Sequence, residues 1–428
     1  MTYMNFVVKK DFNFLNGETE IPSDKSLSHR AVIFSTLAKG KSVIKNFSKG
    51  IDPHSSLEIC KELGADIIEN DNQTIIVNSD GILKKPSKYL YCGNSGTTMR
   101  LMAGILSGQN FDCVLTGDES LSKRPMKRVI EPLSLMGAKI SSQDFHAPLN
   151  ICGSNLTGIT YESKIASAQV KSCVLLAGLF ADGITRYKEI YPSRNHTEIM
   201  LKNVGANIFK QDGYICIEKS ELKPLEINIC GDISSCAYFI VAGLIVPNSK
   251  IILKNIGLNP TRSGIIGVAK QMGGKIEILD QRDVCGETVG DIKVEYSPDM
   301  KGVEFCGEII PKLIDEIPVI SVLATQCKGQ TVIKDAQDLR NKESDRIETT
   351  VKELSKLGAD IEQTPDGMII NGKTKLNGGV EVESYKDHRL AMSLYVAGLV
   401  CEKEILIKDF EWVNISFPEF LKLFEKLK

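Results

Sequence analysis

The sequence lacks the features that mark several classes of protein. Its longest apolar run, residues 237–247, is about half as long as a membrane-spanning helix, and the N-terminal residues contain no apolar segment of the signal-peptide type. The 12 cysteines form no CxxC pair and no Cys/His cluster with zinc spacing. Basic and acidic residues nearly balance, 52 against 54, which disfavours nucleic-acid binding by bulk charge. We therefore expect a cytoplasmic globular protein that binds neither nucleic acid nor membrane and needs no metal.

What the sequence does contain is repetition. A phrase of an apolar residue, Gly, a small residue, a variable residue and Ile occurs five times, with its glycine at Gly64, Gly137, Gly205, Gly273 and Gly358. Each phrase closes a helix-like segment and opens a strand-like one, and glycine is typical of the position at which a helix ends. A sixth helix, at residues 417–428, closes the chain. We expect Phe6–Val8 to supply the strand that this last repeat lacks.

A second pattern precedes each of these segments. Six stretches start polar and then become almost wholly apolar with many small residues, which predicts buried helices. They lie at residues 24–40, 94–108, 166–183, 232–248, 315–329 and 386–402. The chain therefore reads as six β/α units, each with one buried and one more exposed helix. A length of 428 residues exceeds one ordinary core, so we expect two domains of three units each.

Cations recur in the first turns of the predicted buried helices. They are Lys25, Arg30, Arg100, Lys171 and Arg389. A positive side chain at a helix start opposes the helix dipole by about 0.3–1 kcal/mol, so the repeated arrangement predicts an anion in front of these helices. The alternative is a repetitive scaffold whose polar helix starts are only caps. Capping is the better interpretation for the fourth stretch, DISSCAYF.

Other polar residues near these helix starts have suitable chemistry. Gly96 lies in a turn of small residues that lets a ligand approach the backbone. Lys123 and Arg124 form a charged pair in a loop, a pattern that more often marks a solvated surface. His196 is better explained as a hydrogen-bonded residue than as a catalytic one. Donors that suit phosphate are Ser167, Gln169, Lys171, Ser193 and Arg194.

The densest group of charges is the stretch NKESDRIE at residues 341–348. On a helix, Lys342 and Arg346 would be i,i+4 neighbours, and Glu343 would lie three positions before Arg346. A salt-bridged, exposed helix start would explain the same pattern. Asp315 and Glu316 stand just ahead of a buried segment, where a carboxylate needs a cationic partner. Desolvated acids beside several cations can be tuned for proton transfer.

Together these motifs resemble those of one enzyme family. PSDKSLSHR, NSGTTMR, TGDESLSKRP, ASAQVKS, SRNHTE, GDISS, DEIP, NKESDR, KDHR and SFPEF are similar to the motifs of the EPSP synthases (3-phosphoshikimate 1-carboxyvinyltransferases), in that family's order. The resemblance implies the enolpyruvyl transferase fold, of the α/β (α+β) class, with a ligand cleft between two three-unit domains. One domain would comprise residues 1–20 and 231–428, and residues 21–230 would form the other as an insertion.

The resemblance also implies a reaction. The enolpyruvyl group of phosphoenolpyruvate would pass to the 5-hydroxyl of shikimate 3-phosphate, giving 5-enolpyruvylshikimate 3-phosphate and phosphate on the route to chorismate and the aromatic amino acids. The reaction would proceed by addition and elimination without a metal or an organic cofactor. We expect a monomer, and a target of the inhibitor glyphosate.

Residue by residue, the resemblance implies a role for each matching position. Shikimate 3-phosphate would be bound by Lys25, Ser26, Arg30, Ser167, Gln169, Arg194, Asp315 and Lys342. Phosphoenolpyruvate would be bound by Lys25, Gly96, Arg124, Gln169, Arg346 and Arg389, because the planar fork of arginine pairs with carboxylate and phosphate. Asp315 would act as the base for the attacking hydroxyl, and Glu343 would donate a proton with Lys25 assisting.

Three positions depart from the best-known form of the family. Leu101 and Ala168 fit the family's second class, and Ile415 stands where some members carry a lysine before the terminal S/T-F-P. Two other functions are also compatible with the six repeats. The related transferase acting on UDP-N-acetylglucosamine typically has a reactive cysteine near its Arg-Pro, where TGDESLSKRP has none. A non-catalytic ring of six repeats, as in sliding clamps, would spread its basic residues along one surface.

Overall fold

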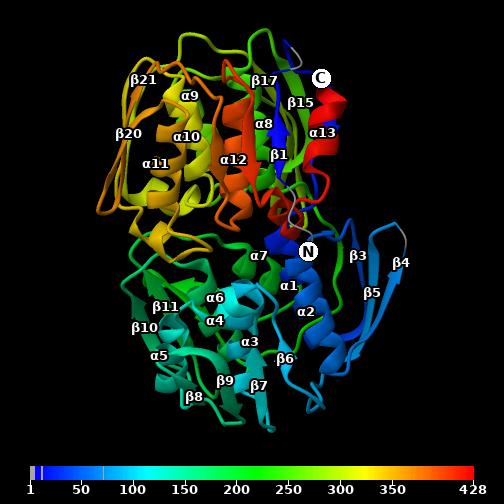
Figure 1. The fold of residues 1–428 in the computed structure, drawn as a ribbon. Coiled ribbons are helices and arrows are strands. Elements are labelled where there is room, and N and C mark those ends of the chain that lie inside the picture. The colour runs from blue at the N-terminus through cyan, green and yellow to red at the C-terminus, as the bar shows by residue number, and fades with distance from the viewer. Residues whose placement is uncertain (1–4, 11–12, 71) are drawn as a thin grey trace. The chain divides into compact units, whose positions relative to one another are not determined.

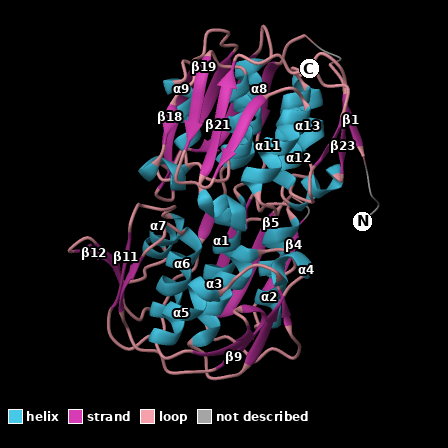
Figure 2. Ribbon diagram, turned by 60° about the vertical axis from the view of Figure 1, so that its left-hand side comes forward, coloured by secondary structure: helices cyan, strands magenta, loops and turns pink. Residues whose placement is uncertain are grey.

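The computed structural model of this chain describes residues 5–10, 13–70 and 72–428. The chain divides into two compact units. Unit 1 consists of the described residues of 1–22 together with 230–283 and 288–428, and unit 2 consists of residues 23–229 and 284–287. In each unit the sheets lie on the outside and helices fill the space between them (Figures 1 and 2). Within the described ranges, no helix is both long enough and apolar enough to cross a membrane.

Unit 2 contains three four-stranded sheets with the same order of strands. The first sheet has the order β14 (Glu226–Asn228), β3 (Lys39–Lys45), β5 (Thr74–Asp80) and β4 (Asp66–Asn70). The second has the order β6 (Leu90–Tyr91), β7 (Cys113–Thr116), β9 (His146–Cys152) and β8 (Lys139–Gln143). The third has the order β10 (Thr160–Ser163), β11 (Thr185–Glu189), β13 (Tyr214–Ile217) and β12 (Ile208–Gln211). In each sheet the second strand pairs in parallel with the first and antiparallel with the third.

Each sheet of unit 2 is accompanied by one buried helix and one more exposed helix. The buried helices are α1 (Lys25–Leu37), α3 (Gly96–Ser107) and α6 (Ala168–Gly178), and the others are α2 (Ile51–Glu62), α5 (Lys127–Leu135) and α7 (His196–Asn203), with a short α4 (Glu119–Ser122). The strand after each buried helix is the second strand of its sheet. Helices α3 and α6 pack so closely that a methyl group on Gly104 would lie 2.2 Å from the carbonyl oxygen of Cys173.

Unit 1 repeats this plan. Its first sheet has the order β2 (Asn16–Glu20), β15 (Lys250–Gly257), β17 (Glu287–Glu295) and β16 (Lys275–Val284). Its second sheet has the order β18 (Glu304–Phe305), β19 (Gly329–Ile333), β21 (Gly367–Gly372) and β20 (Asp360–Thr364). Its helices are α8 (Ile233–Ile245), α9 (Gly264–Gln271), α10 (Ile317–Thr325), α11 (Arg346–Lys356), α12 (His388–Gly398) and α13 (Phe420–Leu427), with the 3₁₀ turns η1 (Gly307–Lys312), η2 (Gln337–Asn341) and η3 (Phe410–Ile415). Helices α8, α10 and α12 are the buried ones and pack against one another (Figure 1).

The last sheet of unit 1 has three strands and uses the N-terminal strand. Its order is β22 (Glu381–Glu383), β23 (Ile405–Lys408) and β1 (Phe6–Val8). Strand β23 pairs in parallel with β22 and antiparallel with β1, with Phe6 opposite Ile407. Strand β1 thus takes the third position of the sheet, which β5, β9, β13, β17 and β21 take in the other sheets. This confirms the expectation that Phe6–Val8 supplies the strand that the last repeat lacks.

The five repeat glycines end helices as predicted. Gly64, Gly137, Gly205, Gly273 and Gly358 have φ values between 84° and 100°. This left-handed conformation is strained for other residues and lets the chain turn from the helix into a strand. The backbone thus explains why the same phrase recurs in the sequence.

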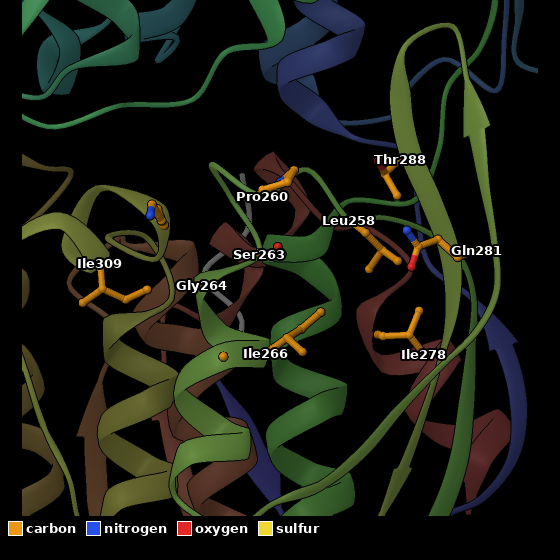
Figure 3. A pocket seen from close by; sticks show the side chains of 11 residues that line it. Leu258, Pro260, Ser263, Gly264, Ile266, Ile278, Gln281, Thr288 and Ile309 are labelled. Carbon is orange, nitrogen blue, oxygen red and sulfur yellow. The ribbon is translucent and has the colours of Figure 1, made fainter.

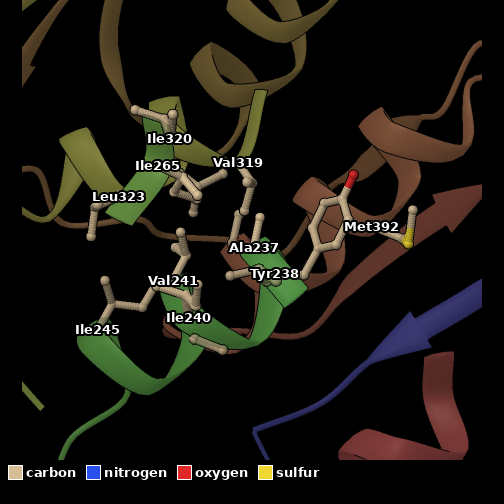
Figure 4. Close-up of a cluster of buried hydrophobic side chains, with 14 of the residues drawn as sticks. Ala237, Tyr238, Ile240, Val241, Ile245, Ile265, Val319, Ile320, Leu323 and Met392 are labelled. Carbon is tan, nitrogen blue, oxygen red and sulfur yellow. The ribbon is translucent and has the colours of Figure 1, made fainter. Parts of the chain in front are cut away.

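The core of unit 1 is built from the small and branched side chains of the buried helices. Figure 4 shows Ala237, Val241 and Ile240 of α8 beside Val319 and Ile320 of α10. An aromatic group closes the other side of α8, where the rings of Phe239 and Phe424 stack with centroids 4.3 Å apart. Burying such side chains contributes roughly 1.5–3 kcal/mol each, which fixes the helices whose N-termini carry the candidate site residues.

Candidate functional site

Five of the six buried helices in the described part of the chain are capped by a side chain at their N-terminus, and α10 is the exception. Asp24 accepts a hydrogen bond from the backbone nitrogen of Leu27 at 2.8 Å, and Ser95 accepts one from Thr98 at 3.1 Å. Ser167, Asp232 and Asp387 cap α6, α8 and α12 in the same way. The capping interpretation is therefore right for these serines and aspartates, and the cations beside them are additional to the caps.

Helix α1 carries two of the predicted site residues near its N-terminus, Lys25 and Arg30. The Nζ of Lys25, which is half-buried, lies 2.9 Å from Oδ2 of the buried Asp52. Arg30 is buried, with Nε 2.7 Å from Oγ1 of Thr197 and Nη2 2.9 Å from Oγ of Ser172. Its Nη1 donates to the carbonyl oxygen of Ser26 at 3.0 Å, so the guanidinium is held rigidly by neutral oxygens.

Around the start of α3, two arginines approach one glycine. A methyl group on Gly96 would lie 2.8 Å from Nη1 of Arg100 and 3.4 Å from Nη1 of Arg124. Both arginines are buried, and Nη2 of Arg124 donates to Oδ1 of Asn94 at 2.8 Å. Two guanidinium groups and the N-terminus of a helix thus border the same small space. This combination suits a phosphate or a carboxylate.

Arg100 is a site residue to which the sequence assigned no substrate. Its Nη1 donates to Oε1 of Gln169, whose Nε2 donates to Oγ1 of Thr97 at 2.9 Å. Gln169, which is predicted to contact both substrates, is therefore joined directly to the Gly96 region. The signal in the sequence was the cation in the first turn of a buried helix.

Lys171 differs from the other cations at helix starts. It is almost completely buried, and its Nζ lies 2.9 Å from a carboxylate oxygen of Glu189 and 2.9 Å from one of Glu198. The anions in front of Lys171 are thus the protein's own, and the interpretation of this residue as facing a separate anion is wrong. Arg194, the predicted ligand of shikimate 3-phosphate, follows Ser193 in the loop between β11 and α7 and is partly exposed.

Three cations surround Asp315 in unit 1. Oδ1 of Asp315 lies 3.6 Å from Nζ of Lys342 and 3.3 Å from Nη1 of Arg346, and Oδ2 lies 3.8 Å from Nη2 of Arg389. Nη2 of Arg346 also lies 2.6 Å from Oε2 of Glu343. All five residues predicted for this part of the chain therefore form one cluster.

A sixth residue, Asp387, organises this cluster. It accepts hydrogen bonds from Nε of Arg346 at 2.8 Å and from the backbone nitrogen of Arg389 at 2.9 Å. Burial is the largest effect on Asp387 and raises its pKa, but the charge and hydrogen bond of Arg346, together with the charge of His388, hold that pKa below its usual value. Burial alone would lower the pKa of Arg346 and Arg389, and nearby carboxylates raise it instead, so both guanidinium groups stay charged.

The expectation that Lys342 and Arg346 share a helix is wrong. Lys342 is extended and follows η2, and helix α11 begins at Arg346. The reason is Asp345, whose carboxylate accepts hydrogen bonds from the backbone nitrogens of Ile347 and Glu348 at 3.1 and 3.0 Å. This cap fixes the helix start, and Lys342 and Arg346 meet at Asp315 rather than along a helix.

His196 is hydrogen-bonded, as its sequence context favoured. Its Nδ1 lies 2.6 Å from Oε1 of Glu287, and both residues are buried. Lys123 is exposed and pairs with Glu119 at 2.6 Å, whereas its neighbour Arg124 is buried in the site. The interpretation as a solvated pair thus holds for only one of the two residues.

The cavity found in unit 1 does not contain these residues. It has a volume of about 440 Å³, and α9, the β16–β17 hairpin and η1 line it with residues such as Leu258, Ile266, Ile278 and Lys312 (Figure 3). None of its 11 lining residues is a predicted site residue. Elsewhere in the described chain, no cluster of His, Cys, Asp or Glu side chains has the arrangement of a metal site.

Solved structures identify the class of fold first. The enolpyruvyl transferase NikO from Streptomyces tendae superposes with a TM-score of 0.80 over 99% of this chain and 97% of its own, at 15% identity. The EPSP synthase of Acinetobacter baumannii superposes with a TM-score of 0.88 over 100% of this chain and 98% of its own, at 40% identity. The predicted α/β enolpyruvyl transferase fold is confirmed.

The family follows from sequence comparison. The family model for EPSP synthase (3-phosphoshikimate 1-carboxyvinyltransferase) matches residues 10–424, and the chain belongs to this family. The 3-phosphoshikimate 1-carboxyvinyltransferase of Thermodesulfovibrio yellowstonii is 52% identical over 99% of this chain and 100% of its own length. The protein of the same name from Bacillus subtilis is 48% identical over 96% of this chain and 97% of its own.

Proposed function

We propose that the residue clusters of the two units carry out the reaction that the family assigns to this chain. The chain is a transferase of aromatic amino acid biosynthesis and moves the enolpyruvyl group of phosphoenolpyruvate to the 5-hydroxyl of shikimate 3-phosphate. The predicted activity is confirmed, and the comparisons favour neither the UDP-N-acetylglucosamine enzyme nor a clamp. The roles of single residues are our proposal.

Shikimate 3-phosphate is bound by residues at the starts of α1 and α6, by the loop before α7 and by the Asp315 cluster. These residues are Lys25, Ser26, Arg30, Ser167, Gln169, Arg194, Asp315 and Lys342. Support comes from the placement of Arg30, whose guanidinium is oriented by hydrogen bonds to Thr197, Ser172 and the carbonyl oxygen of Ser26. A fixed cation pairs with an anion at a lower entropic cost than a mobile one.

Phosphoenolpyruvate is bound by arginines at the starts of α3, α11 and α12. The residues are Lys25, Gly96, Arg124, Gln169, Arg346 and Arg389, and we add Arg100 because it borders Gly96 and bonds to Gln169. A doubly anionic phosphate and a carboxylate need several cations, and in each unit these arginines are buried and oriented by hydrogen bonds.

Asp315 is the base for the 5-hydroxyl. A base must be ionised to accept a proton, and cations at 3.3–3.8 Å stabilise an ionised carboxylate. Glu343 donates the proton to the methylene carbon, with Lys25 assisting. Glu343 lies 2.6 Å from Arg346, which is also proposed to bind phosphoenolpyruvate, so the proposed proton donor stands beside that substrate.

The observation that carries this proposal is the convergence of Lys342, Arg346 and Arg389 on Asp315. We therefore expect Asp315→Asn to lose about 100-fold or more in kcat, with a smaller rise in the KM for shikimate 3-phosphate, which Asp315 is also proposed to contact. The measurement is release of phosphate from phosphoenolpyruvate with shikimate 3-phosphate as acceptor. Asp299→Asn, which removes an exposed partner of Lys328 in the same unit, is the control and should be fully active.

Two outcomes would overturn the proposal in different ways. Turnover with UDP-N-acetylglucosamine and none with shikimate 3-phosphate would refute the reaction itself. Full activity of Asp315→Asn would refute the assignment of the base. As part of the same proposal, the enzyme works in the cytoplasm as a monomer and needs no metal or organic cofactor. The predicted ligand cleft between the domains stays a prediction.

A further inference from the structure

Lys171 is a buried cation that the proposed chemistry does not use. It lies one turn inside α6, and all three of its donors are engaged: Nζ is 2.9 Å from Glu189, 2.9 Å from Glu198 and 3.0 Å from the carbonyl oxygen of Ser193. Glu189 is the last residue of β11, and Glu198 lies in the first turn of α7. Lys171 thus joins the two elements that border the loop Ile190–Asn195.

Glu189 completes the hold on this loop. Its Oε1 accepts a hydrogen bond from the backbone nitrogen of Ser193 at 2.7 Å, and its Oε2 accepts one from the Ser193 hydroxyl at 2.7 Å. Together with Lys171, it binds the nitrogen, the carbonyl oxygen and the hydroxyl of Ser193. A loop residue with all of its polar groups tied to one ion pair has little freedom to move, and the residue that comes after it is Arg194.

Stability alone does not explain this arrangement. Replacing a buried ion pair by apolar residues of similar volume is often neutral or stabilising, because removing the charges from water costs as much as their attraction returns. The three charges are nearly enclosed, with exposed side-chain fractions of 1%, 7% and 14% for Lys171, Glu189 and Glu198. The charges instead fix the conformation of the loop, because the hydrogen bonds of Lys171 and Glu189 each hold one polar atom of Ser193 in place.

We infer that Lys171 and Glu189 are positioning residues that hold Ile190–Asn195, and with it Arg194, in the conformation that binds shikimate 3-phosphate. The inference rests on the proposed role of Arg194 as a ligand of that substrate. Lys171 and Glu189 act through the loop and do not touch the substrate. Ser193 belongs to this device, because its hydroxyl already donates to Glu189.

The test compares Lys171→Met, Arg194→Ala and the double variant by calorimetric titration with shikimate 3-phosphate alone. We expect each single variant to weaken binding about ten-fold or more, because each loses charge-assisted hydrogen bonds or their effect on Arg194. The double variant should bind shikimate 3-phosphate no more weakly than whichever single variant has the lower affinity, because Lys171 acts through Arg194. The KM for phosphoenolpyruvate at saturating shikimate 3-phosphate should stay within about two-fold of the parent value.

Two further variants keep the test decisive. Lys188→Met removes the neighbouring exposed lysine of β11 and should leave binding unchanged. If Lys171→Met does not fold, Glu189→Gln replaces it, because the amide keeps the shape and one acceptor for Ser193; it should weaken binding about three-fold or more, again only when Arg194 is present.

The possible failures are distinguishable. Effects of Lys171→Met and Arg194→Ala that add in the double variant would overturn the positioning role. A lower melting temperature for Lys171→Met with unchanged binding would also overturn it and leave a structural ion pair. Unchanged binding by Arg194→Ala would instead refute the proposed role of Arg194 and the inference with it.

Discussion

Arg346 binds Asp387 with two nitrogens, Nε at 2.8 Å from Oδ2 and Nη2 at 3.2 Å from Oδ1. The remaining face of the guanidinium is directed at Asp315 and Glu343, the two carboxylates proposed for proton transfer. Asp387 also caps α12 at Arg389. One buried carboxylate therefore orients the guanidinium of Arg346 and fixes the helix start at which Arg389 stands.

Asp387→Asn should weaken phosphoenolpyruvate binding and destabilise the fold together. The asparagine has the same shape but cannot balance the buried charge of Arg346, so we expect a loss of about 3 kcal/mol in the free energy of unfolding and of roughly 100-fold in kcat/KM for phosphoenolpyruvate. Urea unfolding and steady-state kinetics measure the two effects.

A matched control separates the site from stability. Asp291 is also buried, pairs with Lys254 and accepts a hydrogen bond from the backbone nitrogen of Asn255 at 2.8 Å. Asp291→Asn should lower stability without changing the KM for phosphoenolpyruvate. Equal kinetic effects in both variants would show that Asp387 has no specific role in the site.

Arg124→Lys should weaken phosphoenolpyruvate binding while leaving the fold intact. Lysine keeps the charge but loses the planar fork and the hydrogen bond to Asn94, which together contribute on the order of 1.5–3 kcal/mol, or about a 10- to 150-fold rise in KM. Arg128→Lys, at a half-buried position of α5, is the control. Unchanged saturation by phosphoenolpyruvate in Arg124→Lys would exclude Arg124 from the binding site.

Gly96→Ala and Gly104→Ala should fail in different ways although they lie in the same helix. The added methyl group at residue 96 meets the mobile ends of Arg100 and Arg124, so those side chains shift and phosphoenolpyruvate binds more weakly in a normally stable protein. At residue 104 it would lie 2.2 Å from a backbone carbonyl of α6, so we expect a loss of about 2 kcal/mol or more of stability. A Gly96→Ala protein with unchanged KM for phosphoenolpyruvate would count against the position assigned to that substrate.

His29 should make stability fall with decreasing pH. Burial lowers the pKa of His29 from 6.5 to about 3, against an opposing effect of Asp52 and with smaller contributions from Lys25, Arg30 and His54. Between about pH 6.5 and pH 3 the unfolded chain binds a proton that the folded chain does not. The stabilisation is therefore complete above pH 6.5 and is lost by at most about 1.4 kcal/mol per pH unit below it.

The check is the pH dependence of urea unfolding in His29→Gln. Glutamine cannot titrate, so the slope between pH 6.5 and pH 4 should be smaller than in the parent by up to one proton. Identical slopes for His29→Gln and the parent protein would contradict the assignment of this titration to His29.

The sequence predicted those parts of the fold that depend on local backbone needs. The helix ends at Gly64 and its four counterparts could be predicted, because only glycine readily adopts the left-handed conformation that ends each helix. The buried helices could be predicted from the apolar stretches, because a helix that is enclosed on all sides carries apolar residues on all of its faces. The family resemblance then located Asp315, Arg346 and Arg389, which the structure brings together.

The parts that sequence reasoning missed depend on partners from distant segments. Lys171 looked like a cation facing a ligand because Glu189 and Glu198 reach it from another strand and another helix. Asp387 was not recognised as the main partner of Arg346, because no spacing in the sequence links the two residues. The start of α11 was misplaced because an aspartate cap at Asp345 competes with a longer helix, and propensity alone does not decide between them.

The pairing of β1 with β23 has a consequence for how the chain is made. Unit 2 is almost entirely one continuous segment and can fold while synthesis continues. Strand β1 is translated at the beginning, yet its partner, with Ile407 opposite Phe6, is translated near the end. The third sheet of unit 1 can therefore close only after β23 has emerged from the ribosome, long after β1 has been made.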